Sequence, residues 1–471
     1  MRLPARTPVY ALRLVIGLVP LSVLIAATVS GKQPMPVSPT VPPPVPTIRG
    51  HHVLGQNPLP APAPLNGAAD KNGNGNNKYP ETGPELTLGE CIAIALERQP
   101  SLKAVKHSTE ATEAGYKALT NFGTVGTIIS PDLEIRKQQA KRGLMATSAE
   151  YQKLHNEVVQ DVTRLYYTAV YARQQRQLAE NVVIRMEFLV EVGRKILEDP
   201  KLDPKTLEGF NTIKLRMMEN GLLEAKKLYS TAAIGRQKAL AGLREVMGVD
   251  DRTFAFRIKD DSLPVMKQNV PLTKDRVVEL ALERRPELVL AAAGVDAFRL
   301  EVYAQGRIPF KRVVPTLASG ADIHAKEIPH AVRTPTDYRP GGILPEMPTQ
   351  LVGSKYDRVC RAMAFAQRAE AVYEKARNLI LVEAEGTFFD FELASEKLTL
   401  SKQQFDLSKD LQQRARDAQD TTRAKDQLLQ AEVVAAKAQS EYVQAVHDYL
   451  LALAALERVT AGGIRPSFPG R

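Results

Sequence analysis

The sequence predicts a mostly α-helical protein, built from long antiparallel helices that occur in two duplicated halves. Three observations support this fold class. Ala, Leu, Glu, Lys, Arg and Gln dominate from residue 85 onward, a composition typical of long helices. One short motif occurs twice, at matching places in the two halves. Near the end of each half, apolar residues follow the alternating three-four spacing of a coiled coil.

The N-terminus has the pattern of an export signal. Several arginines precede an apolar run from Leu14 to Val29, and small residues follow it. A basic flank, a short apolar core and small residues are typical of a secretory signal peptide, which we assign to residues 1–31. An uncleaved anchor helix is the alternative, which Pro20 and the borderline length of the run disfavour. The rest of the chain has no apolar stretch near the roughly 20 residues of a membrane-spanning helix.

Residues 32–85 form a tail that cannot bury a core. Prolines crowd the stretch between Pro34 and Pro64, and a run of Asn and Gly follows from Asn72 to Asn77. Such compositions are typical of semi-rigid and flexible spacers. We expect this tail to be disordered, and we expect the same of residues 463–471.

The duplication is visible in two correspondences. The motif Ala-Leu-Glu-Arg-x-Pro-x-Leu spans Ala95–Leu102 and recurs at Ala281–Leu288, 186 positions later. Further along, Asn156–Tyr167 matches Asn378–Phe389, 222 positions later. Matches that keep one order along the chain indicate an internal repeat. We therefore expect a first helical repeat over 86–250, a linker over 251–271 and a second repeat over 272–462.

Each repeat is predicted to contain a short helix, a non-helical segment, a long helix, a tight turn and a medium helix, in this order. A long helix of about 65 residues spans roughly 100 Å at 1.5 Å per residue. The short and medium helices, placed end to end, have a similar total length and can pair with the long helix along its course. The expected helices cover about 87–119, 131–199 and 204–247 in the first repeat, and about 273–304, 354–418 and 421–460 in the second.

The medium helices carry a coiled-coil seam. From Leu215 to Val246, apolar residues recur at alternating steps of three and four, interrupted only by Arg236. The same pattern recurs 213 positions later, from Leu428 to Val459. An ordinary amphipathic helix drifts off a strict 3.5-residue period over this length. The many alanines of the second seam predict a close approach of the packed helices.

A strand pattern occurs between the short and long helices of the second repeat, over about 306–353. From Thr316 to Lys326 polar and less polar residues alternate, which is typical of a barrel strand in lipid and also of a half-buried soluble strand. The prolines between 329 and 348 disfavour a return strand inside a ladder. The first repeat offers only Gly123–Ser130 in the same place. We expect a reduced β-strand insert.

The two cysteines are expected to be free. Cys91 and Cys360 both fall in predicted helices, and an exported chain allows a disulfide between them. Their places along the helices put them roughly 40 Å apart, against a limit of about 7 Å between the α-carbons of a disulfide. We expect two buried free thiols.

The ordered set of features resembles the TolC-like outer-membrane efflux family over residues 86–462. The set comprises the export signal, the duplicated halves, a short helix led by Leu-Thr with its later proline, the long and medium helices and the strand insert. The closing Ala454–Val459 is also similar to that family's end. The resemblance implies a homotrimer that forms a trimeric α-barrel, a hollow periplasmic tunnel topped by a shared barrel in outer-membrane lipid. It further implies a periplasmic adaptor protein and an inner-membrane transporter as partners.

Four aspartates at the turns between long and medium helices are candidate tunnel-mouth residues. They are Asp199 and Asp203 in the first repeat, and Asp417 and Asp420 in the second. Rings of carboxylates select cations at a channel mouth. The alternative is helix capping, because Asp203 and Asp420 stand directly before expected helix starts.

No motif in the sequence indicates an enzyme, a cofactor or a metal. The chain lacks the phosphate-binding Gly-x-x-x-x-Gly-Lys-Ser/Thr loop and the zinc-binding His-Glu-x-x-His pair. None of His107, His155 and His447 completes the Glu-x-x-His pair of di-iron bundles. The net charge of +10 is spread over helices in which acidic residues alternate with basic ones, which favours solvated faces over a nucleic-acid-binding stripe.

Two function hypotheses remain. The first is a tunnel component of an efflux or type I secretion system in the outer membrane and periplasm, a passive conduit for small molecules or proteins. The second is a periplasmic coiled-coil scaffold without a conducting channel. A hollow trimer with a conducting lumen separates the first hypothesis from the second.

Overall fold

The computed structural model describes residues 83–121, 130–198, 212–250, 254–266, 272–308, 354–417 and 422–471. The chain divides into two units, Met1–Ala61 and Pro62–Arg471, and every described residue belongs to the second. The expected signal peptide, the tail up to residue 82 and nearly all of the expected strand insert lie outside the described residues, so these assignments stay predictions.

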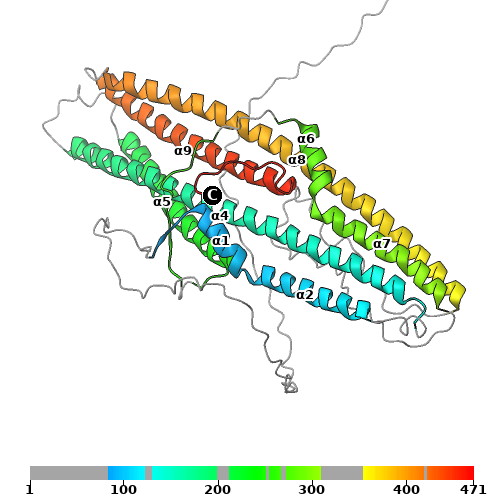
Figure 1. The fold of residues 1–471 in the computed structure, drawn as a ribbon. Coiled ribbons are helices and arrows are strands. Elements are labelled where there is room, and N and C mark those ends of the chain that lie inside the picture. Colours follow the sequence, from blue (N-terminus) through cyan, green and yellow to red (C-terminus); the bar gives the residue numbers. More distant parts are fainter. Residues whose placement is uncertain are drawn as a thin grey trace, which may run out of the picture. The chain divides into compact units, whose positions relative to one another are not determined.

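The described residues are mostly α-helical, and they fall into two equivalent halves as predicted (Figure 1). The four helices of the first half have 11, 22, 66 and 36 residues, and those of the second have 11, 22, 63 and 38. The first half contains β1 (Glu85–Leu86), α1 (Leu88–Arg98), α2 (Pro100–Asn121), α4 (Leu133–Glu198) and α5 (Thr212–Met247). The second contains β2 (Arg257–Ile258), α6 (Lys274–Arg284), α7 (Pro286–Arg307), α8 (Lys355–Asp417) and α9 (Thr422–Val459).

Each predicted short helix is in fact two helices, so the expectation of six helices is wrong and the described residues contain eight. The breaks fall at Gln99, with φ −55° and ψ 119°, and at Arg285, with φ −66° and ψ 125°. Both residues precede a proline, which disfavours the α-helical conformation of the residue before it. The motif that marks the duplication therefore encodes a bend, and Figure 1 shows α1 and α6 turned away from α2 and α7.

Side-chain caps fix where the helices start. Thr87 and Glu90 form a reciprocal capping box at α1, in which the Thr87 amide donates to Glu90 Oε2 at 2.8 Å. Ser354 and Asp357 make the same exchange at α8. These caps satisfy amides that have no partner within a helix. The long helix α4 then runs without interruption through its middle, as predicted.

The two long helices organise the packing of the rest. Along its course α4 contacts α1, α2 and α5, while α8 contacts α6, α7 and α9. Helix α4 also contacts α7 and α9, and these contacts join the two halves. The neighbours therefore follow the order α5, α4, α9, α8 on one side of the bends and α2, α4, α7, α8 on the other.

The main core lies where α1, α4, α5, α8 and α9 meet, and Leu88, Tyr166, Leu243, Ile380 and Leu453 are fully buried there. Burying a side chain of this size contributes roughly 1.5–3 kcal/mol. The predicted seams are confirmed where side-chain burial is described, because each such member, the exceptional Arg236 included, is buried or half-buried. The side chain of Leu428 lies outside this description. In α9 the small seam residues are buried, namely Ala431, Ala435, Ala438, Ala445 and Ala452.

Two segments outside the helices differ from expectation. The linker contains β2, which pairs in parallel with β1 and sets Leu86 opposite Ile258. The segment 463–471 was expected to be disordered, but Phe468 is buried and its ring centroid lies 5.7 Å from that of Tyr167. The burial of Phe468 helps to hold this segment against the core, because an aromatic side chain buries a large apolar area.

The two cysteines are not bonded to each other, which confirms the prediction, but only one of them is buried. Cys91 lies in the core on α1. Cys360 is exposed, and the expectation that it is buried is wrong. It shares an outward face of α8 with Tyr356, one turn earlier, while Arg358 between them points into the protein.

Candidate functional site

Of the four candidate aspartates, only Asp417 is among the described residues. Asp417 is the last residue of α8; its side chain is exposed and accepts a hydrogen bond from Gln413 Nε2 at 3.0 Å. Asp199, Asp203 and Asp420 lie outside the described residues. The structure therefore places one of the four, and both their gathering at a tunnel mouth and their role as caps stay predictions.

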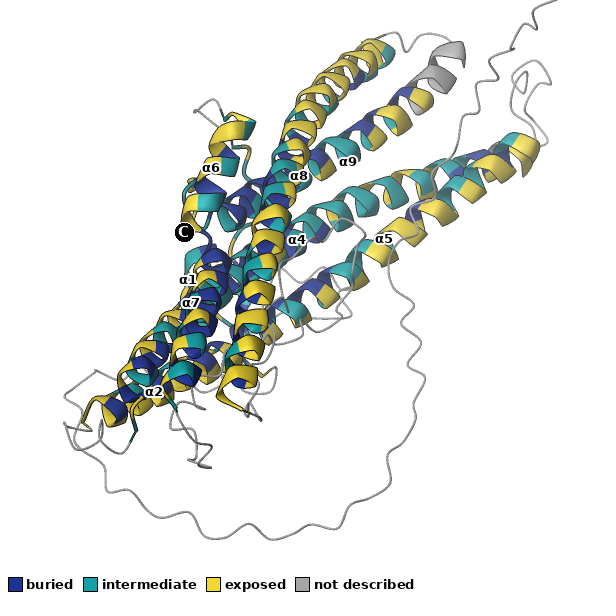
Figure 2. Cartoon of the chain, turned by 90° about the vertical axis from the view of Figure 1, so that its right-hand side faces the viewer, coloured by how far each residue is buried: buried dark blue, intermediate teal, exposed yellow. Residues whose placement is uncertain are grey.

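Charged groups close to this end tie neighbouring helices together. On α5, Glu219 accepts from Arg194 of α4 at 2.6 Å and from Arg216 at 2.7 Å. On α9, Glu432 lies 3.7 Å from Arg185 of α4 and 3.4 Å from Arg416 of α8. Exposed pairs of this kind contribute little stability. The α4/α5 and α8/α9 hairpins diverge towards these ends in both views (Figures 1 and 2).

The two outer helices of the α5, α4, α9, α8 order expose large apolar side chains. On α8, from Val382 onward, these residues follow one another at steps of four and seven, which places them on one side of the helix. Figure 2 shows exposed residues along much of α8. Contiguous apolar surface is uncommon on a monomeric soluble protein and marks an interaction site. The α8 residues are Val382, Phe389, Leu393, Leu400, Leu407 and Leu411, and the α5 residues are Ile213, Met217, Leu223, Leu228 and Ile234.

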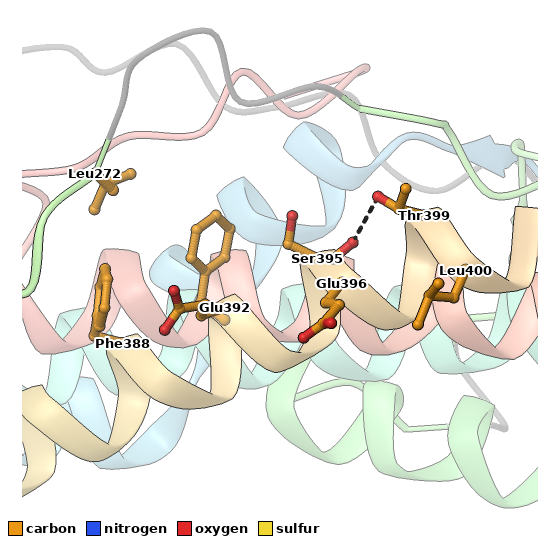
Figure 3. Close-up of a pocket in the computed structure, with 8 residues that line it drawn as sticks. Leu272, Phe388, Glu392, Ser395, Glu396, Thr399 and Leu400 are labelled. Atoms are coloured by element: carbon orange, nitrogen blue, oxygen red, sulfur yellow. Dashed lines mark hydrogen bonds between the residues drawn. The ribbon is translucent and has the colours of Figure 1, made fainter.

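A groove of about 560 Å³ lies along α8 beside this row (Figure 3). Phe388, Phe391 and Leu272 supply apolar walls, and Glu392 and Glu396 supply carboxylates. Thr399 donates from its hydroxyl to the carbonyl of Ser395, so that hydroxyl is already satisfied within the helix. Leu400 belongs both to the groove and to the exposed apolar row, so the groove borders the row.

A buried ion cluster holds the bend between α6 and α7. Arg285 donates to Glu287 at 2.5 and 3.1 Å and also to Glu383 of α8, and Arg458 of α9 donates to Glu383 at 2.5 Å. Two positive and two negative charges balance one another here. Burial opposes ionisation of Glu287, but the Arg285 charge outweighs it and holds the pKa of Glu287 below its usual value. The first half has the uncharged Gln99 in the place of Arg285.

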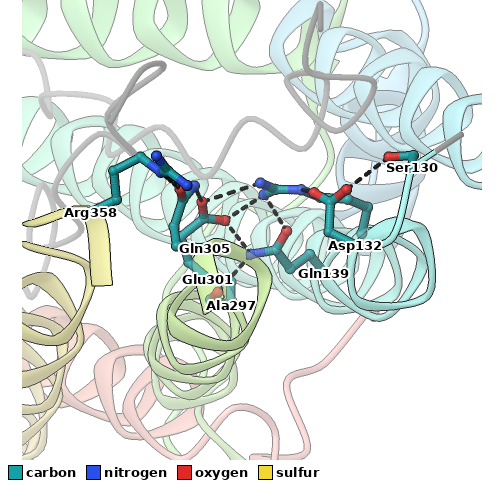
Figure 4. Close-up of polar contacts among 8 residues, drawn as sticks. Ser130, Asp132, Gln139, Ala297, Glu301, Gln305 and Arg358 are labelled. Atoms are coloured by element: carbon teal, nitrogen blue, oxygen red, sulfur yellow. Dashed lines mark hydrogen bonds and ion pairs between the residues drawn. The ribbon is translucent and has the colours of Figure 1, made fainter. Parts of the chain in front are cut away.

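A second buried polar cluster joins α4, α7 and α8 at the helix ends next to segments 122–129 and 309–353 (Figure 4). We call it the root network and define it as Asp132, Arg136, Gln139, Glu301, Gln305 and Arg358. The sequence reasoning missed both clusters. The sequence did contain a pattern that pointed to the root network. Arg136 and Arg358 are 222 positions apart, which is the same offset that relates the two long helices.

The described residues show neither a metal centre nor a helix suited to a bilayer. Within them, no group of three or more His, Cys, Asp and Glu side chains is placed to bind a metal ion. Among the described helices, none combines the length and the apolar character needed to cross a membrane.

Comparison with known proteins identifies the fold. No protein-family model and no curated protein matches the sequence. Among solved structures, the outer-membrane channel OprN superposes with a TM-score of 0.60 at 15% identity, over 83% of this chain and 95% of its own. The open MtrE outer-membrane channel of Neisseria gonorrhoeae gives 0.58 at 15% identity, over 83% and 95%. The outer-membrane protein VceC of Vibrio cholerae gives 0.53 at 13% identity, over 80% and 97%.

These matches confirm the predicted TolC-like resemblance at the level of the fold. They cover 80–83% of the chain. The chain therefore has the fold of outer-membrane channels, with the duplicated long helices that this fold is built from.

Proposed function

We propose that this protein is the tunnel component of an efflux or type I secretion system, a passive conduit for small molecules or proteins. The proposal places it in the outer membrane and periplasm after export by its signal peptide. It includes a homotrimer, contact with outer-membrane lipid, and partnership with a periplasmic adaptor protein and an inner-membrane transporter. The observation that carries it is the exposure of apolar rows on the two outer helices, α5 and α8.

The two rows suit a ring better than a simple pair. Helices α5 and α8 lie at opposite ends of the order α5, α4, α9, α8, and each has one exposed side without a partner among the described helices. When two different surfaces of identical chains meet, the contact is head-to-tail, and it generates a ring if the rotation closes. Contact between α8 of one copy and α5 of the next buries both rows and leaves a lumen between the copies.

The fold also supports the proposal of a conduit. Long helices of about 100 Å bridge a distance that no compact site needs, and the structures with this fold are outer-membrane channels. A periplasmic coiled-coil scaffold remains the second candidate, because it shares the long helices and the seams. A conducting lumen distinguishes the two functions.

The test is assembly and conductance of the full chain in detergent and lipid. Light scattering of the purified protein is expected to give a trimer, and planar bilayers are expected to show discrete conductance steps. Leu407→Glu, in the exposed row of α8, should lower the trimer fraction and the conductance together. Lys402→Glu is the control, because Lys402 is exposed on α8 away from the row.

The outcomes separate the hypotheses. A trimer that conducts in the wild type and is lost only in Leu407→Glu supports the conduit. A stable trimer without conductance favours the scaffold. If the wild-type protein is a monomer at micromolar concentration in detergent, the proposed ring is wrong, and so is the proposed conduit.

A further inference from the structure

The root network forms a continuous buried chain of polar contacts between two points where the helical body joins the segments 122–129 and 309–353. Ser130, just before α4, lies at one end of this chain (Figure 4). Ile308, just after α7, lies at the other end, where its carbonyl accepts from Arg358. A third joining point, Ser354, immediately precedes α8 and is close to Arg358 in the sequence. The network thus connects the ends of three helices that are far apart along the chain.

The first half of the network joins α4 to α7. The Ser130 hydroxyl donates to Asp132 Oδ1 at 2.7 Å, and Arg136 Nε donates to Asp132 Oδ2 at 2.9 Å. Arg136 also donates to both carboxylate oxygens of Glu301, a bidentate contact that fixes orientation as well as distance. Gln139 supports the pair by donating to Glu301 Oε2 at 2.8 Å and to the Ala297 carbonyl at 3.0 Å.

The second half joins α7 to α8. Gln305 Nε2 donates to Glu301 Oε1 at 2.6 Å, and its own Oε1 accepts from Arg358 Nε at 2.9 Å. Arg358 also donates to the carbonyl of Ile308 at 2.7 Å, the last described residue before the insert. Gln305 therefore links the two ends of the network, with Glu301 on one side and Arg358 on the other.

The duplication explains why two arginines meet on α7. Arg136 and Arg358 are each the fourth residue of their long helix, and α7 contacts both long helices. Helix α2, the counterpart of α7, has Gly115 and Leu119 at the positions equivalent to Glu301 and Gln305. Leu119 packs against Leu133 and Ala140 of α4 instead. An apolar contact thus stands in the first half where the second half has a polar network.

The network is electrically balanced and shielded from water. Asp132 and Glu301 offset Arg136 and Arg358, and Glu301 has 8% of its surface exposed. Removing one partner of such a buried pair leaves a charge without compensation, which is strongly destabilising. Replacing a polar link that carries no charge has a smaller effect.

We propose that the root network is a positioning joint, which fixes the spacing of Ser130, Ile308 and Ser354 and so the way both segments leave the helical body. Glu301 is its central positioning residue, because it is the one carboxylate that receives both α4 and α7 side chains. The inference deepens the proposed function and rests on it for the role of the two segments in the membrane. The joint itself is a property of the helical body and can be measured without transport.

The test is hydrogen exchange of the full chain, read peptide by peptide. Glu301→Gln should speed amide exchange in 132–140, 300–308 and 354–365 by about tenfold or more, because Asp132 alone then offsets the two buried charges of Arg136 and Arg358. Exchange in the core segment 158–170 should stay unchanged. Asp296→Asn is the matched control, since Asp296 of α7 pairs with Arg142 of α4 at 3.2 Å but both side chains are 39% exposed.

A milder variant keeps the proposal testable if Glu301→Gln does not accumulate. Gln305→Met cuts the link between Glu301 and Arg358 without stranding a charge, so faster exchange confined to 354–365 and 305–308 is expected. The proposal would be contradicted if exchange at these helix ends stayed unchanged, or if exchange in the core segment 158–170 rose as much as at the helix ends. Equal effects of Asp296→Asn and Glu301→Gln would also overturn it. Failure of the conduit shows separately, as a wild-type protein without conductance.

Discussion

The amide of Gly89 in the first turn of α1 donates a hydrogen bond of 2.8 Å to the carbonyl oxygen of Gly470, beyond the end of α9. The start of the first half is thereby joined to the segment that follows the second. A Cβ atom on residue 89 would stand 2.8 Å from that oxygen, and Gly470 has a φ of +77°, which L residues rarely adopt. Two glycines therefore allow the segment 463–471 to close over α1.

Gly89→Ala should destabilise the protein, although alanine favours helix formation. The added methyl group meets backbone, which cannot rotate away, and overpacking of this kind costs about 1–3 kcal/mol. Gly115→Ala is the control, because Gly115 lies in α2 with open space around it. Alanine there should stabilise the helix by about 0.5–1 kcal/mol. Thermal unfolding followed by circular dichroism measures the Tm of both variants. A rise in Tm for both would show that the segment around Gly470 moves away from the added methyl group at no cost.

The two thiols should differ sharply in reactivity. Cys360 is exposed and should be alkylated in the native protein at pH 8. Burial raises the pKa of Cys91 to about 12, so its thiol stays protonated and shielded until the protein unfolds. Mass spectrometry should find one label on the native chain and two in denaturant. Native Cys360→Ser should carry none, and a label on Cys91 under native conditions would contradict the core placement of α1.

Stability should fall in acid because of the buried carboxylates. The pKa values of Glu287 and Glu301 are both held below the usual glutamate value: burial opposes this, but the charges of Arg285 and Arg136 outweigh it. A carboxyl with a lowered folded-state pKa contributes stability above its unfolded pKa, about 4.3, and loses it as the pH falls through the folded value. Denaturant unfolding should therefore give constant stability from pH 7 to about 5 and a decline below about 4.3. Glu287→Gln should flatten that decline, whereas an unchanged slope would show that the cluster does not control it.

The long-range plan of the fold could be predicted because it is periodic. The seam from Leu428 to Val459 repeats every three or four residues, and the repeat motif gave the two halves in register. The bends were missed although Pro100 and Pro286 were visible, because an isolated proline also fits the first turn of a helix. Here each proline does start a helix, and the residue before it ends another.

The contacts of the candidate sites could not be predicted in the same way. Arg136 and Glu301 are 165 positions apart and meet only because α4 and α7 pack side by side. The strands β1 and β2 have two residues each, too few for any alternation to show. Their pairing depends on tertiary contacts, and so does the burial of Phe468. The sequence shows that Arg136 and Arg358 occupy equivalent positions in the two long helices. Only the structure shows that both side chains contact residues of α7.

The last prediction tests the seam of α9 together with the proposed assembly. Ala438 has 1% of its surface exposed and lies in the α9 seam, where helices α4 and α8 pack. A leucine at this position has no room, and overpacking should cost about 1–3 kcal/mol in each chain. We expect Ala438→Leu to lower the Tm, to weaken assembly of the proposed trimer, and to raise the sensitivity of cells to exported toxic compounds.

Lys437→Leu is the matched control, one residue away and with the same new side chain. The Lys437 side chain is 76% exposed, and its ammonium lies 3.9 Å from the carboxylate of Glu441 on the same helix. Because this substitution changes the outer face of α9, the Tm and the trimer should change far less than in Ala438→Leu. Equal losses in both variants would mean that the three-four row is not the packing face. If Ala438→Leu abolishes the trimer while export is unchanged, the seam is still the packing face of α9. Export would then not depend on the trimer, and the proposal that the trimeric tunnel carries the transport would be wrong.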